Sequence, residues 1–287
     1  MPENTMITPS LIYHYTSVES FYKIITSGKI WLSDARRMND YKEIEICLKL
    51  LESLSDVYPQ VSETLPAQIF FQNMPDVDYY ICSFSEHSDL LSQWFRYGQD
   101  GAGMALGFSY SNEDLRENYT TPYLNFMTNL SIQARHVNYI NKADQDNPEK
   151  LFQLIFDCIR NPQDYSLMSP ATKSLFEDSM KMKDYGFHEE HEVRIGCFSA
   201  RSLGYLTARC SPFTKTLCNL PILQRPTERD LVRYLPLPIN NNTGLQLKKI
   251  IKGPACRVAD ADIYFLLEKS GYTNRVDISS SQTPYRP

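Results

Sequence analysis

Residues 186–198, with the sequence GFHEEHEVRIGCF, constrain the fold more than any other segment of the chain. From position 190 to 195 charged residues alternate with His191, Val193 and Ile195, which is the pattern of a β-strand with two different faces. On such a strand Glu190, Glu192 and Arg194 share one face. Two neighbouring carboxylates on a sheet are costly to bury unless cations pair with them. The segment therefore predicts either a polar site built around this strand or an exposed edge strand with a solvated ion pair.

The same segment raises the question of a metal site, because two histidines and three glutamates lie within five residues. A zinc-binding helix of the His-Glu-x-x-His type needs histidines four residues apart, so that both lie on one face. Here His188 and His191 are three apart and stand at the start of a predicted strand, where an odd separation sends them to opposite faces. No third ligand follows at a suitable spacing, so we predict that the site holds no metal.

Cysteine usage and hydropathy narrow the class of protein. The seven cysteines are scattered and form no Cys-x-x-Cys pair, which argues against a disulfide framework and a zinc ribbon. No run of about 18 apolar residues occurs, and the first residues lack the basic and apolar regions of a secretory signal. We therefore expect a cytoplasmic protein with no membrane segment.

Charge is unevenly distributed, although the net charge is only −5. Residues 201–287 contain 13 Lys and Arg against 6 Asp and Glu, whereas residues 1–200 contain 16 against 28. This asymmetry indicates a surface for a polyanion in the last third of the chain. Ordinary clustering of surface charge explains it equally well.

The opening of the chain predicts a strand, a helix and a second strand. Residues 10–15 are apolar and aromatic, and they run into the capping-box pattern of Thr16 and Glu19. The helix that follows is expected to end at Gly28, and residues 29–33 are expected to form the next strand. His14 then stands at the end of the first strand.

The remaining pattern predicts one α+β domain over residues 1–287, with a mixed β-sheet core. Residues 147–185 are expected to form a helical insertion, and residues 201–245, which hold several prolines, are expected to be irregular. The other predicted strands are 78–85, 132–140, 190–198, 245–251 and 276–279, and the other predicted helices are 41–56, 59–73, 89–97 and 260–270.

Several short motifs are shared with a known family. They are IYHYTSVESFYKIITSGKIWLSDARRMND at 12–40, ICSFSE at 81–86, WFRYGQDGAGMALGF at 94–108, HEVRI at 191–195 and SSSQTPYR at 279–286. In these motifs the chain resembles a large bacterial family of uncharacterised proteins that open with His-Tyr-Thr and continue to an Asn-Asp pair. The resemblance spans most of the chain.

That family in turn resembles the ADP-ribosyltransferase superfamily. In its histidine–tyrosine–glutamate branch a His ends the first strand, tyrosines follow, and a Glu starts a late strand. The opening is similar to that of DNA-modifying ADP-ribosyltransferase toxins and of RNA 2′-phosphotransferases. The resemblance implies an ADP-ribosyltransferase-like sheet and NAD as co-substrate, with no metal.

The resemblance also implies which residues hold NAD. His14, with Thr16 in the same motif, would bind the adenosine ribose, and Tyr97 would lie against the nicotinamide, with Trp94 as the other candidate. The residues alone leave simpler roles open. His14 could bond to the backbone at a strand end, and Trp94 and Tyr97, three apart on a helix, could pack into the core.

Charged residues complete the implied site. Glu192 would be the catalytic carboxylate, and Arg36 or Arg37 would approach the pyrophosphate. Glu190 stands two residues before Glu192, which is similar to the Glu-x-Glu signature of transferases that modify protein arginines. Such residue types suit the reaction, because a carboxylate stabilises the positive charge that develops at the ribose and a guanidinium pairs with phosphate.

The expected function is therefore transfer of ADP-ribose from NAD to a macromolecule, as in a toxin or phage-defence effector. The basic last third of the chain and the opening favour RNA or DNA as acceptor, whereas Glu190 favours protein arginine. A toxin would also imply an antitoxin protein as partner. The alternative is a non-catalytic nucleotide-sensing or interaction module on the same fold.

Overall fold

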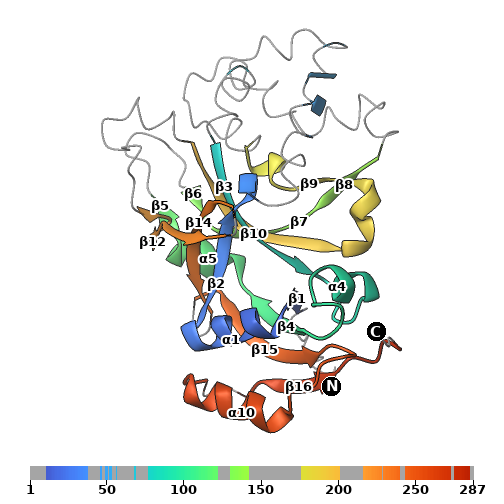
Figure 1. Ribbon diagram of the computed structural model, residues 1–287. Coiled ribbons are helices and arrows are strands. Elements are labelled where there is room, and N and C mark those ends of the chain that lie inside the picture. The colour runs from blue at the N-terminus through green and yellow to red at the C-terminus, as the bar shows by residue number, and fades with distance from the viewer. Residues whose placement is uncertain are drawn as a thin grey trace, which may run out of the picture.

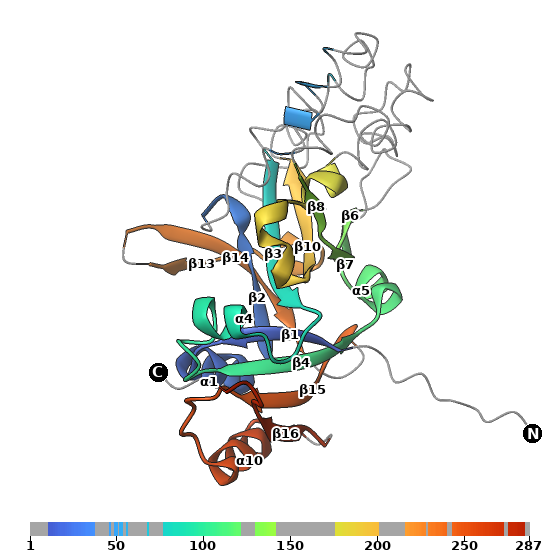
Figure 2. The same ribbon diagram turned by 90° about the vertical axis from the view of Figure 1, so that its right-hand side faces the viewer.

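The computed structural model describes residues 11–37, 77–121, 130–141, 176–200, 216–227, 229–239, 243–272 and 275–284, together with single positions between 46 and 68. In this part of the chain the protein is a mixed structure, with a mostly antiparallel sheet and few helices (Figures 1 and 2). This arrangement is compatible with the predicted α+β class.

The main sheet has ten strands in the described residues. Its central path runs β13-β14-β2-β3-β1-β4-β15-β16, and β10 and β7 branch from β3. All pairs in this sheet are antiparallel except β15 with β16. The strands are β1 (Ile12–Thr16), β2 (Lys29–Asp34), β3 (Val77–Ser85), β4 (Met104–Tyr110), β7 (Gln133–His136), β10 (Glu192–Ala200), β13 (Leu223–Pro226), β14 (Leu231–Pro238), β15 (Leu245–Lys252) and β16 (Asp277–Ser280).

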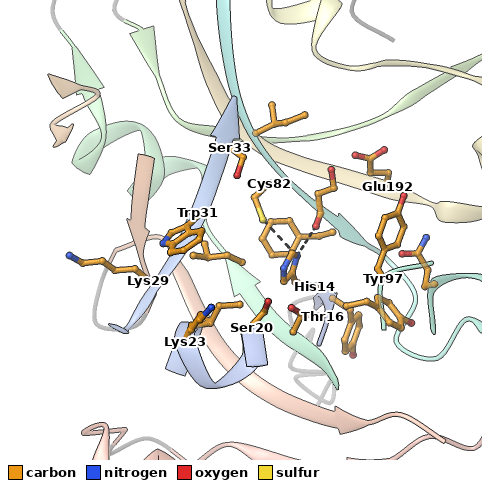
Figure 3. A pocket seen from close by; sticks show the side chains of 18 of the residues that line it. His14, Thr16, Ser20, Lys23, Lys29, Trp31, Ser33, Cys82, Tyr97 and Glu192 are labelled. Atoms are coloured by element: carbon orange, nitrogen blue, oxygen red, sulfur yellow. Dashed lines mark hydrogen bonds between the residues drawn. The ribbon is translucent and has the colours of Figure 1, made fainter. Parts of the chain in front are cut away.

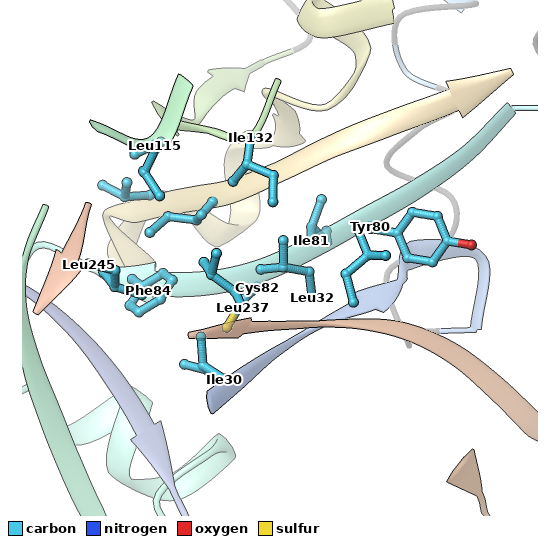
Figure 4. Close-up of a cluster of buried hydrophobic side chains, with 14 of the residues drawn as sticks. Ile30, Leu32, Tyr80, Ile81, Cys82, Phe84, Leu115, Ile132, Leu237 and Leu245 are labelled. Carbon is cyan, nitrogen blue, oxygen red and sulfur yellow. The ribbon is translucent and has the colours of Figure 1, made fainter. Parts of the chain in front are cut away.

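Strand β3 connects three neighbours. It pairs with β10 along its whole length, while its other edge pairs with β2 at Tyr80 and Ile81 and with β1 at Ser85. Nearly all of its residues are buried, as the continuous apolar run predicts. Apolar side chains from neighbouring strands pack in the same core cluster, including Ile30 of β2 and Leu237 of β14 (Figure 4). The strands carrying His14 and Glu192 therefore flank one buried strand.

Helix α1 (Val18–Ser27) follows β1 and is capped one residue later than expected. Ser17 is the cap, because its Oγ accepts from the backbone N–H of Ser20 at 3.1 Å. Thr16 cannot take that position, since it still pairs with Met104 in the sheet. The helix ends at Gly28, whose φ of 62° is left-handed, as the sequence predicts.

The other helical elements and the minor sheets are short. The α-helices are α4 (Leu91–Arg96), α5 (Asn112–Asn118) and α10 (Asp260–Lys269), and the 3-10 helices are η1 (Ala35–Arg37) and η5 (Tyr185–Glu190). Three two-stranded sheets pair β5 (Thr120–Thr121) with β6 (Leu130–Ser131), β8 (Asn138–Ile140) with β9 (Met182–Asp184), and β11 (Thr216–Leu217) with β12 (Leu220–Pro221). No helix in the described ranges is long and apolar enough to cross a membrane.

The hairpin β13–β14 corrects the prediction that residues 201–245 are irregular; it extends away from the rest of the sheet in Figure 2. Prolines are tolerated there because β13 pairs only with residues 231–234 of β14. Pro236 and Pro238 lie beyond that ladder and pair with Trp31 and Lys29 of β2. Among the described residues the other side of β14 has no strand partner there, so a missing N–H on that side breaks no ladder bond.

Two other predictions change in detail. The strand expected at 132–140 is divided at Val137, so that β7 joins the main sheet and β8 joins β9. Of the helical segment expected at 147–185, residues 147–175 lie outside the described residues, Phe176–Ser179 are helical and Met182–Asp184 form β9. The helices expected at 41–56 and 59–73 also lie mostly outside the described residues.

A buried ion cluster ties β14 to the centre of the sheet. Arg233 of β14 contacts Asp34 of β2 at 3.4 Å and Asp78 of β3 at 3.1 Å. Both carboxylates are buried, and burial together with the neighbouring Asp78 raises the pKa of Asp34. The guanidinium therefore offsets two negative charges that the sheet has removed from water.

We predict that Arg233→Gln lowers the free energy of unfolding by about 3 kcal/mol, because it leaves buried carboxylates undercompensated. Denaturant unfolding measures this change. Arg275→Gln is the matched control, since its ion pair with Asp277 is exposed, and it is expected to change stability by less than about 0.5 kcal/mol. Equal effects of the two substitutions would contradict the prediction.

Candidate functional site

One cavity of about 290 Å³ brings together several of the predicted residues. His14 and Thr16 enter it from β1, Tyr97 from the end of α4, and Glu190 and Glu192 from the junction of η5 and β10 (Figure 3). These segments are far apart in sequence, and β3 joins them in space. The cavity therefore contains a histidine, an aromatic ring and a carboxylate pair.

Trp94 is not part of the cavity lining, and the prediction that it stacks on nicotinamide is wrong. Its side chain is fully buried, lies edge-on against Tyr15 with ring centroids 4.7 Å apart, and donates from Nε1 to Asp89 at 2.6 Å. With both faces packed in the core, the ring has none to offer a ligand. Tyr97, three residues later, is 44% exposed and lines the cavity.

The two arginines expected near the pyrophosphate also lie elsewhere. Arg36 and Arg37 belong to η1, which continues from the end of β2, and neither lines the cavity. Arg37 instead pairs with Asp230 at 2.6 Å on the surface. The structure therefore does not bring these guanidinium groups to the predicted site.

Glu192 is the first residue of β10, and its carboxylate is buried among cations. Arg194 donates from Nε to Oε1 at 2.7 Å and from Nη2 to Oε2 at 3.1 Å, and Lys183 donates to Oε2 at 3.0 Å. Burial alone would raise the pKa of Glu192, but Arg194 and Lys183 outweigh it, helped by the Ser83 hydroxyl, and hold this pKa at about 2. The carboxylate is therefore ionised at neutral pH.

Glu190 does not lie on the strand, so the expected alternation is wrong at this position. It ends η5, and His191 then takes a left-handed conformation with φ of 43°, which delays the start of β10 to Glu192. The side chain nevertheless turns toward the same cluster. Its Oε1 accepts from Arg96 at 2.9 Å and from the Tyr97 hydroxyl at 3.3 Å.

Lys183 joins the two carboxylates and was not anticipated from the sequence. It comes from β9, is fully buried, and donates to Glu190 at 2.7 Å as well as to Glu192. Its ammonium also lies 4.8 Å from the centre of the Phe187 ring. The signal that could have indicated it is charge balance, because Arg194 alone cannot compensate two buried carboxylates.

His14 presents a defined tautomer to the cavity. Its Nδ1 lies 3.0 Å from the backbone carbonyl oxygen of Ser83, which can only accept a hydrogen bond. Neutral His14 therefore carries its proton on Nδ1, leaving Nε2 as an acceptor. Burial lowers the pKa of His14 despite this bond, which favours the neutral form.

Ser83 links the two halves of the site. Its carbonyl holds His14, and its hydroxyl donates to the Glu192 carboxylate. Ser85, on the same face of β3, donates to the backbone carbonyl of Glu190 at 2.8 Å. Ser83 therefore sets the imidazole of His14 and the carboxylate of Glu192 in a fixed relation.

The two histidines of residues 186–198 pack against other aromatic rings. His188 stacks on Tyr185 with ring centroids 4.4 Å apart, and His191 lies edge-on to His87 at 4.3 Å. Across the residues that the structure describes, no group of three or more His, Cys, Asp or Glu side chains is placed to hold a metal ion.

Comparison with known proteins gives a family match of limited extent. A family model described as "Protein of unknown function (DUF2971)" matches residues 93–195. The match includes Tyr97, Glu190 and Glu192 but not His14. No curated protein and no solved structure matches the chain.

The depressed pKa of Glu192 predicts a pH-dependent contribution to stability. Because its folded pKa of about 2 lies below the usual 4.5, this contribution is present above pH 4.5 and is lost as the pH falls toward 2. We expect Glu192→Gln to lower the free energy of unfolding by about 3 kcal/mol at pH 7 and by progressively less below pH 4.5.

Urea unfolding at pH 7, 5, 4 and 3 tests this expectation. Glu189→Gln, an exposed neighbour, is the control and should match the wild type throughout. A stability difference for Glu192→Gln that stays constant with pH would show that the carboxylate is not held ionised by its neighbours.

Proposed function

We propose that the protein is an NAD-consuming ADP-ribosyltransferase that marks a macromolecule. The observation that carries the proposal is that His14 and Glu192, which are far apart in the sequence, line one cavity and both bond to Ser83. The resemblance of the opening and of the HEVRI segment to the ADP-ribosyltransferase superfamily supports the same function, with His14 and Glu192 in matching roles.

The residues of the cavity suit the recognition of NAD. The acceptor Nε2 of His14 fits a ribose hydroxyl, and the exposed Tyr97 ring offers a flat face to nicotinamide. A volume of about 290 Å³ is at the low end for ligand pockets, so the cavity would enclose part of the dinucleotide and leave the rest at its mouth.

The proposed chemistry follows from the charge of Glu192. Positive charge develops at the ribose C1′ as its bond to the nicotinamide nitrogen breaks, much as in glycoside cleavage. An ionised carboxylate that accepts from the ribose 2′-hydroxyl stabilises that charge where it develops. Nicotinamide leaves with the bonding electron pair, and the acceptor attacks C1′ and releases a proton. Lys183 and Arg194 keep the carboxylate ionised and oriented.

Glu190 bears on the identity of the acceptor. Both Glu190 oxygens already accept from Lys183, Arg96 and Tyr97. Both Glu192 oxygens are paired in the same way, so this pairing does not choose between the acceptors. The basic last third of the chain favours a polyanion, and we therefore propose RNA or DNA as the acceptor, in the role of a toxin or phage-defence effector.

A specific observation favours a second candidate, the non-catalytic nucleotide-binding module. Glu192 is only 4% exposed and is paired with two cations, which is also the arrangement of a structural ion cluster. In that case the cavity would bind a nucleotide without cleaving it.

Release of nicotinamide from NAD by the purified protein, with and without added RNA or DNA, separates the two candidates. For the enzyme we expect Glu192→Gln to reduce the rate by about 100-fold or more, because charge stabilisation at C1′ is lost. Glu189→Gln is the control and should retain the rate. Binding of NAD with no release under any of these conditions would support the module and reject the enzyme.

Growth of a bacterial host on induction tests the proposed role as an effector. If the chain modifies nucleic acid, wild type is expected to arrest growth, and Glu192→Gln to relieve the arrest at equal protein level. Equal arrest by both forms would show that any toxicity does not depend on this carboxylate.

A further inference from the structure

A second cluster borders the same cavity, away from the carboxylates. Trp31 of β2 and Tyr234 of β14 have ring centroids 4.6 Å apart, and the Arg225 guanidinium of β13 lies 5.2 Å from the Trp31 ring centre. We call these three residues the aromatic platform. Trp31 and Arg225 line the cavity. In Figure 3, Trp31 lies on one side of His14, and Tyr97 and Glu192 lie on the other.

We propose that the aromatic platform is a nucleotide subsite, in which a base stacks on Trp31 and its phosphate binds Arg225 and Lys29. Every nucleobase has a π-face that stacks on an aromatic ring, and an adjoining guanidinium is suited to a phosphate. No residue of the platform belongs to the cluster around Glu192. The geometry therefore divides the cavity into a stacking end and a carboxylate end.

Arg225 supplies the aromatic platform with a donor for an anion. Its Nε is buried and, among the residues that the structure describes, has no hydrogen-bond partner. A buried donor without a partner is unfavourable, and a phosphate oxygen would satisfy it with a charge-assisted bond.

Lys29 supplies a second cation at the same end. It lines the cavity and is exposed, and it enters from the first residue of the strand that carries Trp31. Arg225 of the hairpin and Lys29 of β2 are thus both in the lining of the cavity that Trp31 enters.

Two molecules present this chemistry, namely the adenylate half of NAD and a nucleotide of a single-stranded acceptor. Only the choice between them rests on the proposed function, whereas the subsite itself rests on its own geometry. If NAD places nicotinamide near Glu192 and a ribose at His14, its adenine falls on the stacking side of His14. If the acceptor occupies the platform, its nucleotide lies within the same cavity as the reacting ribose.

Intrinsic fluorescence tests the subsite without reference to catalysis. The chain has two tryptophans, and Trp94 is fully buried, so a ligand in the cavity is expected to quench Trp31. Titration with AMP up to millimolar concentration should quench wild-type emission, and Trp31→Phe should abolish the change. AMP should bind about 10-fold more weakly to Arg225→Gln, a loss of about 1.4 kcal/mol.

Arg229→Gln is the matched control, because Arg229 has the same charge and lies in the turn of the same hairpin, outside the cavity. It should leave the affinity for AMP unchanged. The inference is overturned if AMP leaves wild-type emission unaltered, or if the two arginine variants lose affinity equally, which would indicate nonspecific attraction to the basic hairpin.

Two further titrations identify the source of the nucleotide. Glu192→Gln, expected to cleave NAD far more slowly than wild type, is titrated with NAD and with a single-stranded RNA of about 12 nucleotides, which is long enough for one single-strand binding site. Quenching by NAD in competition with AMP assigns the platform to the co-substrate. Quenching by RNA in the presence of saturating NAD assigns it to the acceptor.

The outcome is separable from that of the proposed function. Quenching by AMP without nicotinamide release from NAD would retain the subsite and reject the enzyme. Nicotinamide release without any quenching of Trp31 by AMP, NAD or RNA would retain the enzyme and reject the subsite.

Discussion

An ionised carboxylate in the interior of a protein requires cations held against it, and the compensation of Glu192 is the constraint on which this site depends. Arg194 reaches it from the same strand, whereas Lys183 comes from β9, which is paired with β8 in a separate small sheet. Tyr139 of β8 in turn accepts from the backbone N–H of Glu192 at 2.8 Å. The first residue of β10 is thus fixed by side chains from two minor strands as well as by its pairing with β3.

Short sequence patterns were sufficient to predict elements whose ends are set by neighbouring residues in the chain. Gly28 ends α1 because glycine adopts the left-handed conformation without the steric cost that other residues have. The apolar run of β3 likewise predicts a buried strand. His14 and Glu192 also line one cavity. By contrast, periodicity could not show that His191 delays β10, because a single left-handed residue leaves no trace in an alternating pattern.

The residues missed or misplaced by sequence reasoning depend on contacts between remote segments. Lys183 lies in no recognisable motif. Its role becomes apparent only from its contacts with the buried carboxylates of Glu190 and Glu192. Trp94 and Tyr97 are both aromatic and lie three residues apart. Their spacing therefore could not predict that Trp94 packs in the core while Tyr97, at the end of α4, is exposed. Arg225 lies in a proline-rich stretch whose hairpin becomes apparent only through its pairing with β14 and β2.

A crystal structure of the Glu192→Gln variant with NAD tests whether this cavity holds the co-substrate. We expect the nicotinamide ribose to lie within hydrogen-bond distance of residue 192, the nicotinamide against Tyr97 and the adenosine ribose at Nε2 of His14. NAD bound outside this cavity, or a cavity that stays free of NAD at saturating concentration, would contradict it.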